Sequence, residues 1–163
     1  LGAHATPAEY KGKEDDFIDY LIKEVMPVVK EKELAECCDI FCEKNVFDIQ
    51  QSRRYLQAAK ELGFNLKIHA DEIVQFGGAE LAAELKALSA DHLLQASDKG
   101  IEMMRDNKVV ATLLPNTAFS LKEHYARGRY MSDSGCAVAL ATDLNPGSIF
   151  TCSIPLTLAL ACI

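Results

Sequence analysis

A chain of 163 residues, 49% of them hydrophobic, can bury a substantial core, and we expect a single domain over residues 1–163. The formal net charge of −7 at pH 7 argues against binding to nucleic acid or to an anionic membrane surface. No apolar run approaches the ~18 residues that a membrane-spanning helix needs, and no signal peptide is visible. The six cysteines form no matched C-x-x-C pairs, so we expect buried free thiols in a reducing cytoplasm and no structural zinc site.

The first third of the chain alternates between strand and helix patterns. Leu1–His4 has the pattern of a strand end, which suggests a piece of a longer chain. Apolar residues at helical spacing predict a helix from Glu14 to about Lys32, ended or kinked at Pro27. A strand is predicted over Cys38–Cys42, and a capping box then predicts a helix over Asp48–Leu62.

The same alternation continues to the end of the chain. Strands are predicted over residues 66–70, 90–94, 108–114 and 136–142, and helices after 77–78, from 97, over 122–134 and from 153. The run at 136–142 is almost wholly apolar, which is typical of a strand buried on both faces. Alternating strands and helices favour a parallel sheet of right-handed βαβ units. Because a closed eight-unit barrel needs about 250 residues, we predict an α/β fold, a partial TIM-type (β/α)8 barrel of about six units.

Ionisable side chains stand at the carboxyl ends of most predicted strands: His4, Glu43, His69, His92 and Asp143. In barrels of parallel strands this end carries the chemistry. Histidine and aspartate suit zinc or ferrous iron, and a catalytic site takes about three protein ligands and one open position. Taken alone, His69 is as well explained as a hydrogen-bonded core histidine, and His92 as a histidine capped by the neighbouring Asp91. The recurrence at successive strand ends favours a metal-dependent hydrolytic site.

Three motifs follow one another in order: HADE from His69, ADH from Ala90 and TDLNPGS from Thr142. Together with longer stretches such as KIHADEI, SADHLLQAS and LLPNTAFSL, they make the chain resemble the imidazolonepropionase family, of the metal-dependent amidohydrolase superfamily, over essentially its whole length. The resemblance implies hydrolysis of 4-imidazolone-5-propanoate to N-formimidoyl-L-glutamate in histidine degradation, by metal-activated water attacking a cyclic amide. The implied cofactor is one zinc or iron ion per active site of the complete enzyme.

The resemblance also implies roles for individual residues. His69 and Asp143 would ligate the metal, and Asp143 would also shuttle protons. His92 would hold or polarise the substrate carbonyl, and Glu72 would bond to the imidazolone ring. Further substrate contacts would come from His4, Asn145, Gly147 and Ser148.

The chain departs from the family in one respect that matters for activity. The family's two other metal ligands form a His-x-His pair, and these 163 residues contain none. We therefore expect an incomplete barrel domain, without the first strands and the flanking β-sandwich, that is inactive and metal-poor by itself. Two alternatives stay open: a related cyclic amidohydrolase or deaminase, or a non-catalytic barrel fragment. Such a fragment would associate with its missing half or with a second copy as a homodimer. The expected partner is otherwise a small-molecule substrate, with no nucleic acid and no membrane.

Overall fold

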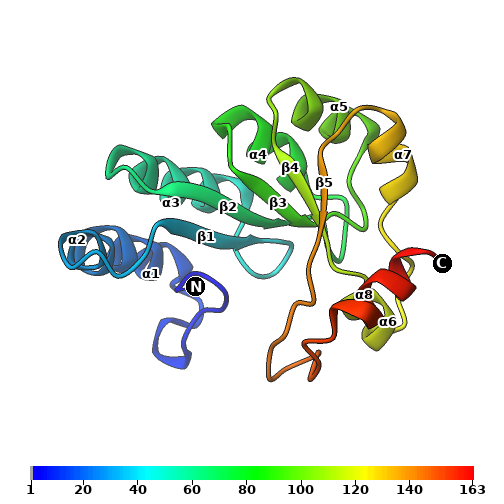
Figure 1. The fold of residues 1–163 in the computed structure, drawn as a ribbon. Coiled ribbons are helices and arrows are strands. Elements are labelled where there is room, and N and C mark those ends of the chain that lie inside the picture. Colours follow the sequence, from blue (N-terminus) through cyan, green and yellow to red (C-terminus); the bar gives the residue numbers. More distant parts are fainter. Residues whose placement is uncertain (1) are drawn as a thin grey trace.

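The computed structural model describes residues 2–163; Leu1, part of the first predicted strand, lies outside the described residues. Five strands form one parallel sheet whose spatial order follows the sequence, β1 to β5 (Figure 1). They are β1 (Cys37–Cys42), β2 (Asn65–Ala70), β3 (Ser89–His92), β4 (Val110–Leu113) and β5 (Val138–Leu140). Because helices connect these parallel neighbours, the predicted α/β fold with successive βαβ units is confirmed.

Helices α3 (Ile49–Glu61), α4 (Gly78–Leu85) and α5 (Asp98–Asp106) pack against the sheet. The core lies between these helices and the strands, where Ile40 and Ile68 from the sheet and Leu56 from α3 are fully buried. The predicted capping box is present at the start of α3, where Asp48 and Gln51 bond to each other's backbone N–H.

The first long helix is interrupted as its proline predicts. It consists of α1 (Glu14–Tyr20), a π-helical segment (Leu21–Val25) and α2 (Met26–Glu31). Pro27 stands in the first turn of α2. Proline has no N–H to donate to the preceding turn, and a wider π turn upstream accommodates that missing bond. A short 3-10 helix, η1 (Ala8–Tyr10), precedes this segment.

Three predicted elements differ from the structure. The first strand is reduced, in residues 2–163, to a parallel bridge between Ala3 and Ile40. The predicted helix over 122–134 is only partly right: α7 (Gly128–Asp133) lies within it, but residues 122–127 are not helical, because α6 (Pro115–Leu121) ends where Lys122 turns left-handed (φ 58°). Strand β5 is shorter than predicted and not buried on both faces, because it lies at the edge of the described sheet.

The C-terminal helix α8 (Ile154–Ala161) packs against α6, beyond the end of β5 (Figure 1). None of the helices described over residues 2–163 is both long and apolar enough to cross a membrane. All six cysteines are free thiols, but the expectation that they are buried is only partly right, because Cys152 and Cys162 are exposed.

Candidate active site

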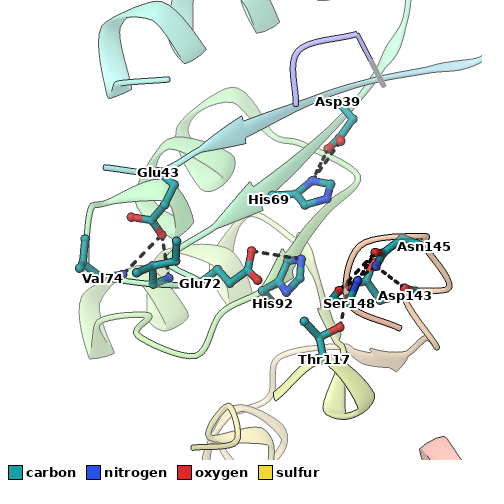
Figure 2. A network of polar contacts seen from close by, with 11 residues as sticks. Asp39, Glu43, His69, Glu72, Val74, His92, Thr117, Asp143, Asn145 and Ser148 are labelled. Carbon is teal, nitrogen blue, oxygen red and sulfur yellow. Dashed lines mark hydrogen bonds and ion pairs between the residues drawn. The ribbon is translucent and has the colours of Figure 1, made fainter. Parts of the chain in front are cut away.

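The parallel strands bring their carboxyl ends to one rim of the sheet, and the predicted site residues gather there (Figure 2). His69 lies near the end of β2, His92 ends β3, and Asp143 follows β5. Glu72 lies in the loop between β2 and α4. The rim therefore carries imidazole and carboxylate groups from three strands that are distant in sequence.

His69 is held from the neighbouring strand by Asp39, a residue that the sequence analysis missed. Its Nδ1 lies 3.1 Å from Asp39 Oδ1 and 3.0 Å from Asp39 Oδ2, and both side chains are largely buried (Figure 2). Burial is the largest single effect and lowers the pKa of His69, but the hydrogen bond to Asp39, together with the charges of Asp39, Asp91 and Glu72, raises the pKa above its ordinary value. A charged residue inside the otherwise apolar strand β1 was the available signal.

The three histidines of the rim lie close to one another. The ring centroid of His69 is 5.4 Å from that of His4 and 5.2 Å from that of His92. The His4 ring also stacks on Phe41, with centroids 5.2 Å apart. Burial, and then the nearby His69, lower the pKa of His4. The charge of a protonated His69 thus disfavours a second positive charge on His4, which suits a neutral imidazole that acts as a hydrogen-bonding group.

Glu72 and His92 form a pair with opposite pKa shifts. His92 Nε2 lies 3.5 Å from Glu72 Oε2, and the His92 side chain is only 3% exposed. Burial, and then His69, lower the pKa of His92 to about 3. Burial above all, together with the charges of Asp143 and Glu43, raises the pKa of Glu72 to about 7 against the opposing effect of His69. The pair therefore places a neutral imidazole beside a carboxyl group that exchanges its proton near neutrality.

The alternative in which Asp91 caps His92 is wrong. The Asp91 carboxylate accepts a hydrogen bond from Ser89 Oγ at 2.9 Å and lies 3.4 Å from Lys67 Nζ. The Nδ1 atom of His92 is buried and has no hydrogen-bond partner among residues 2–163. Buried ring nitrogens are normally bonded, so this atom is available to a ligand.

Two buried carboxylates fix the loop that carries Glu72. Glu43 Oε2 accepts hydrogen bonds from Ile73 N at 2.8 Å and Val74 N at 3.4 Å (Figure 2). Asp71 accepts four backbone N–H bonds at the start of α4, with N···O distances of 2.7, 2.8, 3.2 and 2.8 Å from Phe76, Gly77, Gly78 and Ala79. The loop is thereby held at both ends, and Glu72 is aimed at His92.

Gly78 lets α4 approach β2 this closely, because a Cβ at position 78 would lie 2.8 Å from the Cβ of Ala70. The sequence analysis missed the role of Asp71, and Glu43 was noted only as a strand-end residue. Their partners are backbone groups of a distant or later loop, which no local pattern displays.

Asp143 and the turn after it form the other side of the rim. Thr117 Oγ1 donates a hydrogen bond of 2.6 Å to Asp143 Oδ2. The Asn145 side chain closes the turn: its Nδ2 donates to Asp143 O, and its Oδ1 accepts from Gly147 N and Ser148 N at 2.8 Å each. The predicted substrate-binding residues 145, 147 and 148 thus form one compact turn beside Asp143.

Of the nine described non-glycine residues with a positive φ, five lie at or after the carboxyl ends of strands. Asn45, Asp71, His92, Leu93 and Asp143 have φ values of 67°, 49°, 75°, 61° and 56°. Residues other than glycine adopt such values at a cost, and they cluster at functional sites. The strained backbone therefore coincides with the rim that carries the ionisable groups.

A second set of possible metal-binding side chains differs from the predicted one. Among residues 2–163, the group of three whose ligand atoms lie within 4.8 Å of one another is Asp39, His69 and Asp91. Asp91 is already neutralised by Lys67, and Nδ1 of His69 is occupied by Asp39. These three residues are therefore better explained as an ion-pair network beneath the rim than as a complete ligand set.

Comparisons with known proteins agree with this architecture. No protein-family model matches the chain. It is 75% identical, over all 163 residues, to an imidazolonepropionase of Bacteroides thetaiotaomicron, and it spans 39% of the length of that protein. Among solved structures, guanine deaminase of C. acetobutylicum aligns with a TM-score of 0.71 at 14% identity, over 98% of this chain and 42% of the deaminase. A zinc-bound adenosine deaminase of Xanthomonas campestris aligns with a TM-score of 0.63 at 15% identity, over 94% of this chain and 36% of its own. Over its whole length, the chain is therefore homologous to a segment of the imidazolonepropionases and shares its fold with these two deaminases.

Proposed function

We propose that these 163 residues are part of the catalytic barrel of an imidazolonepropionase, which hydrolyses 4-imidazolone-5-propanoate to N-formimidoyl-L-glutamate. The observation that carries the proposal is the 75% identity over all 163 residues of the chain. Because the chain spans 39% of that relative, the remaining strands and ligands would come from residues outside this sequence.

The donor groups on the rim fit a divalent metal ion, zinc or iron. Asp39 occupies Nδ1 of His69, which leaves Nε2 to face a ligand, and Asp143 offers a carboxylate at the same rim. When bound, such an ion would activate a water molecule and polarise the substrate carbonyl. Two ligands are fewer than a catalytic site needs, so we propose that the 163-residue chain alone is metal-poor and inactive.

The residues of the chain can supply the proton transfers of the reaction. Water oxygen bonds to the carbonyl carbon, the ring C–N bond breaks, and the leaving nitrogen takes a proton. Asp143, oriented by Thr117, would accept the proton from water and deliver it to that nitrogen. His92, neutral because it is buried, would donate a hydrogen bond to the carbonyl oxygen as negative charge develops there.

Glu72 would form a hydrogen bond to the imidazolone ring of the substrate. Its pKa of about 7 lets the carboxyl group donate or accept a hydrogen bond at neutral pH. The buried Glu43 and Asp71 hold its loop, so this contact would be formed without reorganisation of the backbone. His4 and the turn at 145–148 would contact the rest of the substrate.

The test is turnover by the intact, metal-loaded protein that contains these residues, followed as N-formimidoyl-L-glutamate by mass spectrometry. We expect ring opening of 4-imidazolone-5-propanoate and none with the isolated 163-residue chain. Guanine and other cyclic amides serve as competing substrates. Efficient deamination or hydrolysis of one of these, with no conversion of the imidazolone, would overturn the proposal in favour of a related amidohydrolase or deaminase.

A further inference from the structure

We infer that Asp39 is a positioning residue that fixes the orientation and the tautomer of the His69 ring, so that Nε2 faces the metal. The inference rests on the proposed function, in which His69 is a metal ligand. Neither the motifs at the strand ends nor the comparisons assign a role to Asp39, which lies within β1, four residues before the strand-end Glu43.

The geometry leaves Asp39 with His69 as its hydrogen-bond partner. Nδ1 of His69 is 3.1 Å from Oδ1 and 3.0 Å from Oδ2, but one N–H can be directed well at only one of these oxygens. The buried Oδ2 accordingly has no hydrogen bond among residues 2–163. The exposed fractions of the two side chains are 13% for Asp39 and 14% for His69, so water competes little with the bond.

The register of the sheet explains why the two side chains meet. Phe41 lies opposite His69 across β1 and β2, and Asp39 lies two residues back on the same face of β1. The carboxylate therefore approaches the ring diagonally, a distance that side chains of this size can span. Both groups are attached to hydrogen-bonded strands, which limits their movement.

The chemistry of the pair selects one tautomer. An ionised carboxylate only accepts hydrogen bonds, so the proton of a neutral His69 ring must be on Nδ1. The lone pair is then on Nε2, the atom left to bind a metal. Ligating histidines commonly donate their other ring N–H to a carboxylate in this way, and loss of the carboxylate typically costs 10- to 100-fold in metal affinity or activity.

Asp91 provides a matched control within the same network. Its ligand atoms lie within 4.8 Å of those of Asp39 and His69, but its carboxylate is bonded to Ser89 and paired with Lys67. Asp91→Asn removes a negative charge near His69 but leaves Asp39, the hydrogen-bond acceptor of His69, in place. Asp39→Asn removes the same charge and also offers an amide N–H that can donate to Nδ1, which favours the wrong tautomer.

The experiment uses the intact protein, freed of metal and labelled with 15N-histidine, with the His69 signals assigned by loss in His69→Gln. Long-range 1H–15N spectra identify which ring nitrogen carries the proton, and zinc affinity is measured by competition with a chelator. We expect Nδ1–H in the wild type, a shift to Nε2–H in Asp39→Asn, and a 10- to 100-fold weaker zinc affinity in that variant. Asp91→Asn should keep the wild-type tautomer and nearly the wild-type affinity.

A neutral wild-type His69 ring whose single proton is on Nε2 would overturn the inference without need of any variant. Equal losses in Asp39→Asn and Asp91→Asn would also overturn it, because the effect would then come from charge and not from the bond. Both readouts are independent of turnover. If the protein binds zinc but does not open the imidazolone ring, the proposed function fails while the role of Asp39 is still decided.

Discussion

Asp71 is the residue whose replacement should loosen the rim most directly. Its carboxylate accepts four backbone N–H groups at the start of α4, and the bonds from Gly78 and Ala79 are fully buried. An unsatisfied buried donor costs about 1–3 kcal/mol. Removing the carboxylate leaves those two donors without a partner, while water can reach the other two, so Asp71→Ala should cost about 4 kcal/mol.

Asp71→Asn distinguishes the contribution of the hydrogen bonds to stability from the contribution of the backbone conformation. Asparagine tolerates the left-handed φ of 49° at this position. Its Oδ1 can keep three of the acceptor contacts, but its NH2 group faces Ala79 N, so we expect a loss of about 2 kcal/mol. Alanine has no such tolerance, so backbone strain would add to the cost of its two unsatisfied donors.

The assay is urea denaturation of the intact protein, combined with hydrogen exchange of the amides at 76–79. Both variants should lower the urea midpoint and accelerate exchange at those amides. Asp98→Asn is the control, because Asp98 lies in the first turn of α5 but forms an exposed ion pair with Arg127, worth at most ~1 kcal/mol. Asp71→Ala losing no more stability than Asp98→Asn would refute the reasoning.

Three further predictions concern the rim. The pKa of His92 is about 3 in the folded protein, against an ordinary 6.5, so the unfolded chain takes up a proton on His92 at a higher pH. His92 therefore stabilises the fold above pH 6.5. This stabilisation, at most about 5 kcal/mol, is lost as the pH falls toward 3. His92→Gln should flatten the pH dependence of the urea midpoint between pH 6.5 and 4, and an unchanged slope would contradict this. Thr117→Val, which removes the 2.6 Å bond to Asp143, should lower kcat about tenfold with little change in KM, whereas a change in KM alone would assign Thr117 to substrate binding. Asp143→Asn should abolish turnover and weaken zinc binding, and elemental analysis beside the assay checks both effects.

The sequence predicted the parts of the fold that depend on local patterns. Strand β2 and the helix that begins at Asp48 were recognised because burial and capping leave periodic signals along the chain. The start of the helix predicted over 122–134 was wrong because the left-handed turn at Lys122 has no strong local signal, whereas α7 (Gly128–Asp133) lies within the predicted range. The apolar run at 136–142 could not reveal that β5 lies at an edge, since exposure depends on which strands are present beside it.

The residues of the rim could be predicted from the sequence, but the residues that hold them in place could not. His69, His92 and Asp143 could be found because they lie at or just after the carboxyl ends of strands, and parallel strands end on one side of the sheet. Asp39 and Asp71 could not be assigned in the same way, because their partners are set by sheet register and by the closure of a loop. Identifying them requires the three-dimensional arrangement, in which a carboxylate and its donors come from different elements.

The two successive left-handed residues at the end of β3 restrict how this site can change by mutation. At positions 92 and 93 the backbone accepts glycine, asparagine or aspartate far more readily than a β-branched side chain. A library randomised at these two codons and selected only for folded protein should therefore return few valines, isoleucines or threonines. The backbone conformation at positions 92 and 93 thus limits which side chains are tolerated beside Glu72, independently of their effect on activity.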